Sequence, residues 1–181
     1  MAKIYMVRHG EAAASWGDHK DPGLSDLGKR QAEAAADRLE SLGKLPILSS
    51  PLLRCQETAA PLATRWRVKP LIEQHVAELP SPEDQEDRAT WLRGAMQGPW
   101  SDLDPLYQNW AKSVADFIET IQEDTVIFSH FIAINVVLGR VTGSERVVTF
   151  APNNCSITIF GNDSSGLSLI ERGDEAETKI N

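Results

Sequence analysis

Four side chains of the sequence have the chemistry needed to hold and transfer a phosphoryl group: two arginines and two histidines. Each follows a short apolar run: Arg8 and His9 come after residues 3–7, Arg54 after residues 46–49, and His130 after residues 125–128. A guanidinium presents a planar fork of N–H donors that matches phosphate oxygens in pairs. A neutral imidazole can attack phosphorus and form a covalent phosphohistidine, which divides one difficult displacement into two easier steps. Arginine and a second histidine can then stabilise the charge on the equatorial oxygens.

A carboxylic acid completes this set, because a leaving alkoxide needs a proton. Glu78 follows a third apolar stretch, residues 68–77, and is the candidate that donates this proton and afterwards activates water as a base. Ser50 and Pro51 have the pattern of a helix N-cap followed by proline at the first helical position. We therefore expect a helix to begin there and to offer free backbone N–H groups to the same phosphate.

Apolar runs of strand and helix period alternate along the chain and predict the elements that position these residues. The expected strands are residues 3–7, 46–49, 125–128, 146–150, 156–160 and 167–171, with a further apolar stretch at 68–77. The expected helices are residues 25–42, a helix that opens at 50–51 and ends or kinks at Pro61, residues 106–121 and residues 131–141. A turn is expected at 161–163, and residues 171–181 are expected to form a frayed polar tail.

Strands that alternate with helices predict an α/β fold in which a mostly parallel sheet lies between helices. Ligands of such sheets bind beyond the carboxyl ends of the strands, so the candidate residues are expected to meet at one edge. The length suits a single domain, residues 1–181. Residues 80–104 are rich in proline and acidic residues, and we expect an insertion with one short helix that forms a lid. Its Trp91 and Trp100, together with Trp110, either line the pocket or cover core.

Charge and composition limit the classes of partner. The net charge is −8 and the pI is near 5.0, whereas nucleic-acid binding requires a basic face. The N-terminal segment lacks the apolar centre of a signal peptide, and no apolar run approaches the roughly 20 residues of a membrane span. We therefore expect a cytoplasmic protein without nucleic-acid or membrane partners. Cys55 and Cys155 fit no zinc spacing and are expected to be reduced thiols.

Four ordered motifs resemble those of the histidine phosphatase superfamily, the group that contains the phosphoglycerate mutases. They are Arg8-His9-Gly10-Glu11, Leu24-Ser25-Asp26-Leu27-Gly28 with Gln31-Ala32, Ser50-Pro51-Leu52-Leu53-Arg54 with Glu57-Thr58-Ala59, and Ser129-His130. The resemblance extends over nearly the whole chain. It implies a three-layer α/β/α sandwich with a mostly parallel central sheet, and an activity that needs no metal and no other cofactor.

The resemblance also implies a role for each candidate residue. His9 would be the phosphorylated nucleophile, and Glu78 would be the general acid and base. Arg8, Arg54 and His130 would form the phosphate pocket, with His130 also acting in catalysis.

Two further positions belong to the surroundings of this pocket. Glu11 is expected to hydrogen-bond to an arginine or to the loop that carries His9. Ser15 stands six residues after the implied nucleophile, where many members of the superfamily have an asparagine that contacts phosphate. Whether serine makes an equivalent contact is left open by the sequence.

The combined expectation is a phosphatase that works through a phospho-His9 intermediate. Its substrate would be a small phosphorylated metabolite or a protein phosphohistidine. The middle segment is short for a phosphoglycerate mutase, which favours hydrolysis over isomerisation. Two alternatives stay open: mutase-like phosphoryl transfer back to the substrate, and a phospho-ligand binding module without turnover. The physiological substrate and the oligomeric state do not follow from the sequence.

Overall fold

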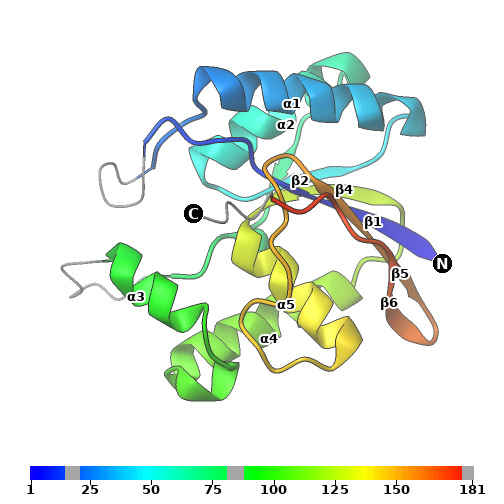
Figure 1. Cartoon of the computed structure of the whole chain (residues 1–181). Helices are drawn as coiled ribbons and strands as arrows, with labels where there is room; N and C mark the ends of the chain where they lie inside the picture. Colours follow the sequence, from blue (N-terminus) through cyan, green and yellow to red (C-terminus); the bar gives the residue numbers. More distant parts are fainter. Residues whose placement is uncertain (15–20, 81–87, 177–181) are drawn as a thin grey trace.

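A six-stranded sheet separates two layers of helices in the computed structural model, which describes residues 1–14, 21–80 and 88–176 (Figure 1). The strands are β1 (Ala2–Arg8), β2 (Ile47–Ser49), β3 (Leu71–Ile72), β4 (Thr125–Ser129), β5 (Ile157–Asp163) and β6 (Gly166–Glu171). The helices are α1 (Asp26–Leu39), α2 (Leu53–Trp66), α3 (Arg88–Ala95), α4 (Pro105–Glu119) and α5 (Phe131–Thr142), with short 3-10 helices η1 (Glu40–Leu42), η2 (Gln74–Val76) and η3 (Trp100–Asp102). The expected three-layer α/β/α fold is therefore confirmed.

The sheet order, β3-β2-β4-β1-β5-β6, brings the ends of four strands to one edge. Strands β1 to β4 pair in parallel, with Arg8 opposite Ser129 in the β1–β4 pair and Ser49 opposite Phe128 in the β2–β4 pair. Strand β5 runs antiparallel to β1, and β6 antiparallel to β5. Because β1, β2 and β4 point the same way, the residues that follow them share the carboxyl edge.

Each face of the sheet carries its own apolar core. Helices α1 and α2 cover one face, where Leu39, Leu62 and Phe128 belong to a single buried cluster. Helices α4 and α5 cover the other face, with α3 to their side (Figure 1). Ile118 and Ile132 are fully buried in the core on this face. This arrangement gives strands β1 and β4 apolar contacts on both sides, as expected of a parallel sheet.

The three tryptophans of the middle segment cover core. Trp91, Trp100 and Trp110 are partly buried and pack against the cluster beneath α4 and α5. The ring of Trp91 lies 5.0 Å from that of Tyr107, and Trp100 lies 6.2 Å from Trp110, centroid to centroid. Residues 81–87 lie outside the described residues, so the lid expected for residues 80–104 stays a prediction.

Helix α2 corrects two expectations. It begins at Leu53 and not at Ser50-Pro51, because Leu52 is the residue with extended backbone at its N-cap. It also continues through Pro61 to Trp66. Proline removes one helical hydrogen bond, but Leu62, Ala63 and Trp66 beyond it are buried, and this burial stabilises the last turns.

Residues 146–150 are not the expected strand. The side-chain carbonyl of Asn135 accepts hydrogen bonds from the backbone N–H groups of Thr149 and Phe150, at 2.7 and 3.1 Å. The N–H of Val147 donates to the carbonyl of Gly98. The Asn135 bonds occupy the donors of Thr149 and Phe150, and Arg146 forms only an isolated antiparallel bridge with Pro99. An apolar run alone therefore misled the assignment.

The C-terminal part differs from the sequence prediction in two places. Strand β5 extends to Asp163, so the hairpin turns at residues 164–165 with Gly166 at a φ of 99°, later than the expected turn at 161–163. Residues 172–176 are not frayed, because Pro152 and Glu175 form an antiparallel bridge. Residues 177–181 lie outside the described residues. Within the described part of the chain, no helix has the length and apolar character to cross a membrane.

Candidate active site

The end of β1 is held by hydrogen bonds from three distant segments. The N–H of His9 donates to the carbonyl of Ser129 at 3.0 Å, and the His9 carbonyl accepts from the side-chain amide of Asn154 at 3.0 Å. The N–H of Gly10 donates to the hydroxyl of Thr58 at 3.0 Å. The backbone on both sides of the His9 side chain is thereby fixed.

Two glycines let this loop lie directly on the first turn of α1. A Cβ atom on Gly28 would lie 2.1 Å from the carbonyl oxygen of Glu11, and one on Gly10 would lie 2.7 Å from the carbonyl oxygen of Gly28. Both distances are well below van der Waals contact. Ser25 caps the helix as expected, accepting from the N–H of Gly28, and it also donates to the Glu11 carboxylate at 2.7 Å.

The ring of His9 presents a lone pair on Nε2. Its Nδ1 lies 2.7 Å from the carbonyl oxygen of Gly10, and a carbonyl can only accept, so Nδ1 carries the proton. The side chain is nearly buried, and this burial, together with the positive charge of Arg54, lowers the pKa of His9 to about 3. His9 is therefore a neutral imidazole at physiological pH, the form that can attack phosphorus.

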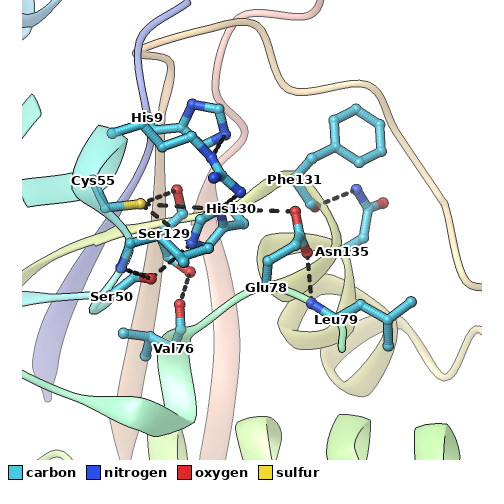
Figure 2. A network of polar contacts seen from close by, with 12 residues as sticks. His9, Ser50, Cys55, Val76, Glu78, Leu79, Ser129, His130, Phe131 and Asn135 are labelled. Carbon is cyan, nitrogen blue, oxygen red and sulfur yellow. Dashed lines mark hydrogen bonds and ion pairs between the residues drawn. The ribbon is translucent and has the colours of Figure 1, made fainter. Parts of the chain in front are cut away.

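Arg54, in the first turn of α2, contacts both histidines. Its Nε lies 3.2 Å from Nε2 of His9, and its Nη2 lies 3.2 Å from Nδ1 of His130. The two imidazole rings are 5.2 Å apart, at an angle of 62°. Figure 2 shows them beside each other at the end of β1 and the beginning of α5.

Arg8 lies beside this pair, with its guanidinium 5.2 Å above the ring of Phe131. Its Nη1 donates to the carbonyl of Pro152 at 2.8 Å. Its Nε is buried and has no hydrogen-bond partner among the described residues. Burial lowers the pKa of Arg8, and the nearby Glu78 carboxylate opposes that shift. A buried guanidinium donor that stays unpaired in the protein suits an anionic ligand.

Glu78 follows η2 and completes the group. Its Oε2 lies 3.8 Å from Nδ1 of His130, and its Oε1 accepts from the N–H of Leu79 at 2.9 Å (Figure 2). The side chain is nearly buried. The structure thus brings together all five residues that the sequence singled out: Arg8, His9, Arg54, Glu78 and His130.

The N-terminus of α2 is not the free anion site that the sequence suggested. The N–H of Leu53 donates to both carboxylate oxygens of Asp21, at 3.0 and 3.2 Å, and the N–H of Leu52 donates to the hydroxyl of Ser50 at 3.2 Å. Side chains of this protein already occupy these donors. The N–H groups of Leu52 and Leu53 are therefore not available to a phosphate.

The remaining sequence expectations have mixed outcomes. Glu11 bonds to Ser25, the N-cap of α1, through its carboxylate and its backbone carbonyl. Its expected role beside the pocket stays a prediction. Ser15 lies outside the described residues. Sequence reasoning missed Pro152 and Asn154, which hold Arg8 and His9, because a backbone carbonyl and an isolated asparagine leave no recognisable pattern.

Both cysteines are buried, and burial favours their thiol form. Cys55 is fully buried, and this burial raises the pKa of its thiol. Burial likewise raises the pKa of Cys155 to about 12, so both are thiols at neutral pH. Within residues 1–14, 21–80 and 88–176, no three His, Cys, Asp or Glu side chains are grouped as metal ligands.

Comparison with known proteins shows the family to which the chain belongs. The chain is 30% identical over 129 residues to the uncharacterized protein Rv0525 of Mycobacterium tuberculosis; the match covers 63% of this chain and 59% of that protein. It is 26% identical over 184 residues to a probable phosphoglycerate mutase, GpmB, of an Enterobacter species, covering 87% of this chain and 84% of the relative. A phosphoserine phosphatase of Entamoeba histolytica, solved with 3-phosphoglyceric acid, has the same fold with a TM-score of 0.76, 20% identity and 98% of each chain covered. The family model of the histidine phosphatase superfamily (branch 1) matches residues 4–175, and the chain therefore belongs to this superfamily.

Proposed function

We propose that this protein is a phosphatase that hydrolyses a small phosphorylated metabolite through a phosphohistidine on His9. One observation carries the proposal: the Gly10 carbonyl fixes the Nδ1–H form of His9, while Arg54 contacts its Nε2 lone pair. The nucleophile is thus neutral, oriented and next to a guanidinium that can hold the phosphoryl oxygens.

The first step transfers the phosphoryl group to His9. The Nε–H of Arg54 moves from Nε2 of His9 to a phosphoryl oxygen. The freed lone pair of Nε2 attacks phosphorus, the bond to the leaving oxygen breaks, and a P–N bond forms. Arg8, Arg54 and His130 stabilise the negative charge of the three equatorial oxygens. Glu78 protonates the departing alkoxide, since it is the carboxyl group beside His130.

The second step returns the enzyme to its starting state. Glu78, now a carboxylate, takes a proton from water, and the resulting nucleophile attacks phosphorus and breaks the P–N bond. Inorganic phosphate leaves, and His9 regains its Nε2 lone pair. This chemistry uses only side chains of the protein, so we propose that turnover needs no metal.

The substrate class is proposed from the relatives. The similar structure is a phosphoserine phosphatase, and one matched relative is a probable phosphoglycerate mutase. Both names refer to small phosphorylated metabolites. The similarity to a probable phosphoglycerate mutase also keeps a second function open, phosphoryl transfer back to the substrate. That reaction would use the same phospho-His9 intermediate.

The proposal is tested by trapping the intermediate. An aryl phosphate labelled at phosphorus and quenched in base should leave the label on His9, and His9→Ala should lower turnover at least about 1,000-fold. His75→Ala is the matched control, because the ring of His75 is exposed and contacts Glu73 and Phe117, which are not among the five candidate residues. Substantial turnover by His9→Ala would contradict the nucleophile assignment.

Product analysis separates the two reactions. Stoichiometric inorganic phosphate from a panel of phosphorylated metabolites supports a phosphatase. An isomerised substrate without phosphate release would establish the mutase, and binding without any label on His9 would establish a phospho-ligand binding module.

A further inference from the structure

His130 is enclosed by groups that determine which ring nitrogen carries its proton. Nη2 of Arg54 lies 3.2 Å from Nδ1, and a guanidinium has only donors, so Nδ1 presents a lone pair. Nε2 lies 2.8 Å from the hydroxyl of Ser50 (Figure 2). We propose that Ser50 is a positioning residue that holds His130 in the Nε2–H form, so that His130 binds an anion only after taking up a proton on Nδ1. The inference rests on the proposed function, in which His130 holds a phosphoryl oxygen.

The surroundings of Ser50 fit this role. Ser50 follows β2 and is completely buried, and its oxygen also accepts from the N–H of Leu52 at 3.2 Å. The hydroxyl oxygen is therefore fixed in place by α2. Cys55 flanks the same ring nitrogen at 3.4 Å, but its thiol donates to the Ser129 carbonyl at 3.4 Å and is only a weak acceptor. Ser50 thus provides the strong acceptor for Nε2–H.

The charged and titratable groups that face His130 act in opposite directions. Arg54, from α2, disfavours a second proton on the ring through its positive charge. Glu78, which follows η2, lies 3.8 Å from Nδ1 and favours that proton when it is ionised. His9, at the end of β1, and Cys55, on α2, are neutral. An anion that binds among these groups adds negative charge and favours protonation of His130.

The chemistry of the anion makes this proton necessary. A phosphoryl group offers only acceptors, so a lone pair on Nδ1 would repel its oxygens. A proton from solvent adds to the Nδ1 lone pair of His130. The Nε2–H group continues to donate to the hydroxyl of Ser50. Nη2 of Arg54 turns from the ring to the anion. Without Ser50, the His130 ring could move its single proton from Nε2 to Nδ1 once Arg54 has turned to the anion. Nδ1–H would then contact the anion, and the protein would take up no proton from solvent. Ser50 therefore couples anion binding to proton uptake.

The experiment measures protons and affinity with sulfate, a tetrahedral dianion that does not titrate near neutral pH. Calorimetry in buffers of different ionisation enthalpy gives the protons taken up per sulfate bound. The wild-type protein should take up about one proton, and its sulfate affinity should therefore fall as the pH rises. Ser50→Ala should abolish most of the uptake and flatten the pH profile, and Ser50→Thr should restore both.

Two additional variants control for packing. Ser49→Ala is matched, because Ser49 is equally buried and its hydroxyl donates to the Ser50 carbonyl at 2.9 Å and not to His130. It should behave like the wild type. Ser50→Cys fills the position with a side chain at least as large as serine, but its thiol is a poor acceptor. It should resemble Ser50→Ala in proton uptake, which separates loss of the acceptor from any disturbance that the smaller alanine causes.

Nitrogen NMR of the His130 ring separates failure of this inference from failure of the proposed function. The unliganded wild type should show protonated Nε2 and unprotonated Nδ1. A Nδ1–H ring, or unchanged proton uptake in both Ser50→Ala and Ser50→Cys, would overturn the role of Ser50. If sulfate did not bind at all, the phosphate site itself would be refuted, while the spectrum would still report the tautomer.

Discussion

At the level of single residues, one guanidinium organises both histidines of the site. Arg54 donates through Nε to His9 and through Nη2 to His130, so each ring keeps a lone pair on the nitrogen that faces it. The Gly10 carbonyl and the Ser50 hydroxyl lie at the opposite ring nitrogens of His9 and His130, respectively. The positive charge also contributes to the low pKa of His9.

The lowered pKa of His9 predicts a pH-dependent stability. The folded value of about 3 lies below the ordinary value of 6.5, so the unfolded chain binds more protons between these limits. The free energy of unfolding should fall as the pH falls through this range, by at most about 1.4 kcal/mol per pH unit from this residue. Thermal unfolding of the wild type and of His9→Gln, compared from neutral to acidic pH, isolates the contribution. Parallel curves would contradict it.

Glu78 is expected to act on the leaving group. Glu78→Gln keeps the size of the side chain but cannot donate a proton to an alkoxide. It should lower kcat/KM about 100-fold or more for an alkyl phosphate and much less for a nitrophenyl phosphate, whose leaving group needs no proton. Steady-state kinetics on both substrates measures the difference. Equal losses would show that another group is the acid.

At the level of elements, the loop after β1 and the start of α1 form one close-packed unit. A side chain on Gly28 would collide with the backbone of Glu11. We predict that Gly28→Ala lowers stability by about 1–3 kcal/mol and reduces turnover, because the loop that carries His9 must move. Chemical denaturation and kinetics measure the two effects. Gly94→Ala is the control, since nothing lies within 4 Å of its added Cβ.

Elements with a strong local signal were predicted correctly from the sequence. Helix α4, expected at 106–121, spans Pro105–Glu119 with Asp104 as its N-cap, and α5, expected at 131–141, spans Phe131–Thr142. Both have apolar faces long enough to define their period. Strand β4 is a continuous buried run and was placed within one residue.

Elements that depend on distant partners were predicted poorly. The start of α2 is capped by Asp21, from a segment far back in the chain, and the run 146–150 is held by Asn135. Neither interaction has a local pattern. Arg8, His9, Arg54 and His130 could be predicted from their motifs, and Glu78 from its place after an apolar stretch. The contacts of Asn154 and Ser50 have no such pattern and required the structure.

At the level of the whole molecule, the chain beyond β6 supports the active-site loop. The N–H of Asn153 donates to the carbonyl of Asp174, and the N–H of Ala176 donates to the carbonyl of Ala151, both at 2.8 Å. The carboxylate of Asp174 also contacts Arg38 of α1 at 3.3 Å. Residues 174–176 therefore connect the loop that holds Arg8 and His9 to the helical layer on one face.

Removal of this segment should affect activity more than folding. Deletion of residues 174–181 should lower kcat/KM about 10- to 100-fold, because a small displacement of aligned catalytic groups is costly. The Tm should fall by only a few degrees. Deletion of residues 177–181 alone removes none of these bonds and should leave the kinetics unchanged. A short deletion as harmful as the long one would contradict this account.

The long separation of contacting residues in the sequence has a consequence for when the site forms during synthesis and folding. Arg8 and His9 are held by Pro152 and Asn154, which are 144 and 145 positions away in the sequence. Such contacts close large loops and form late during folding. A chain still on the ribosome therefore has His9 and the first helices before the segment that aligns them. The arrangement of Arg8 and His9 should form only once residues 152–154 have been made and have docked against the end of β1.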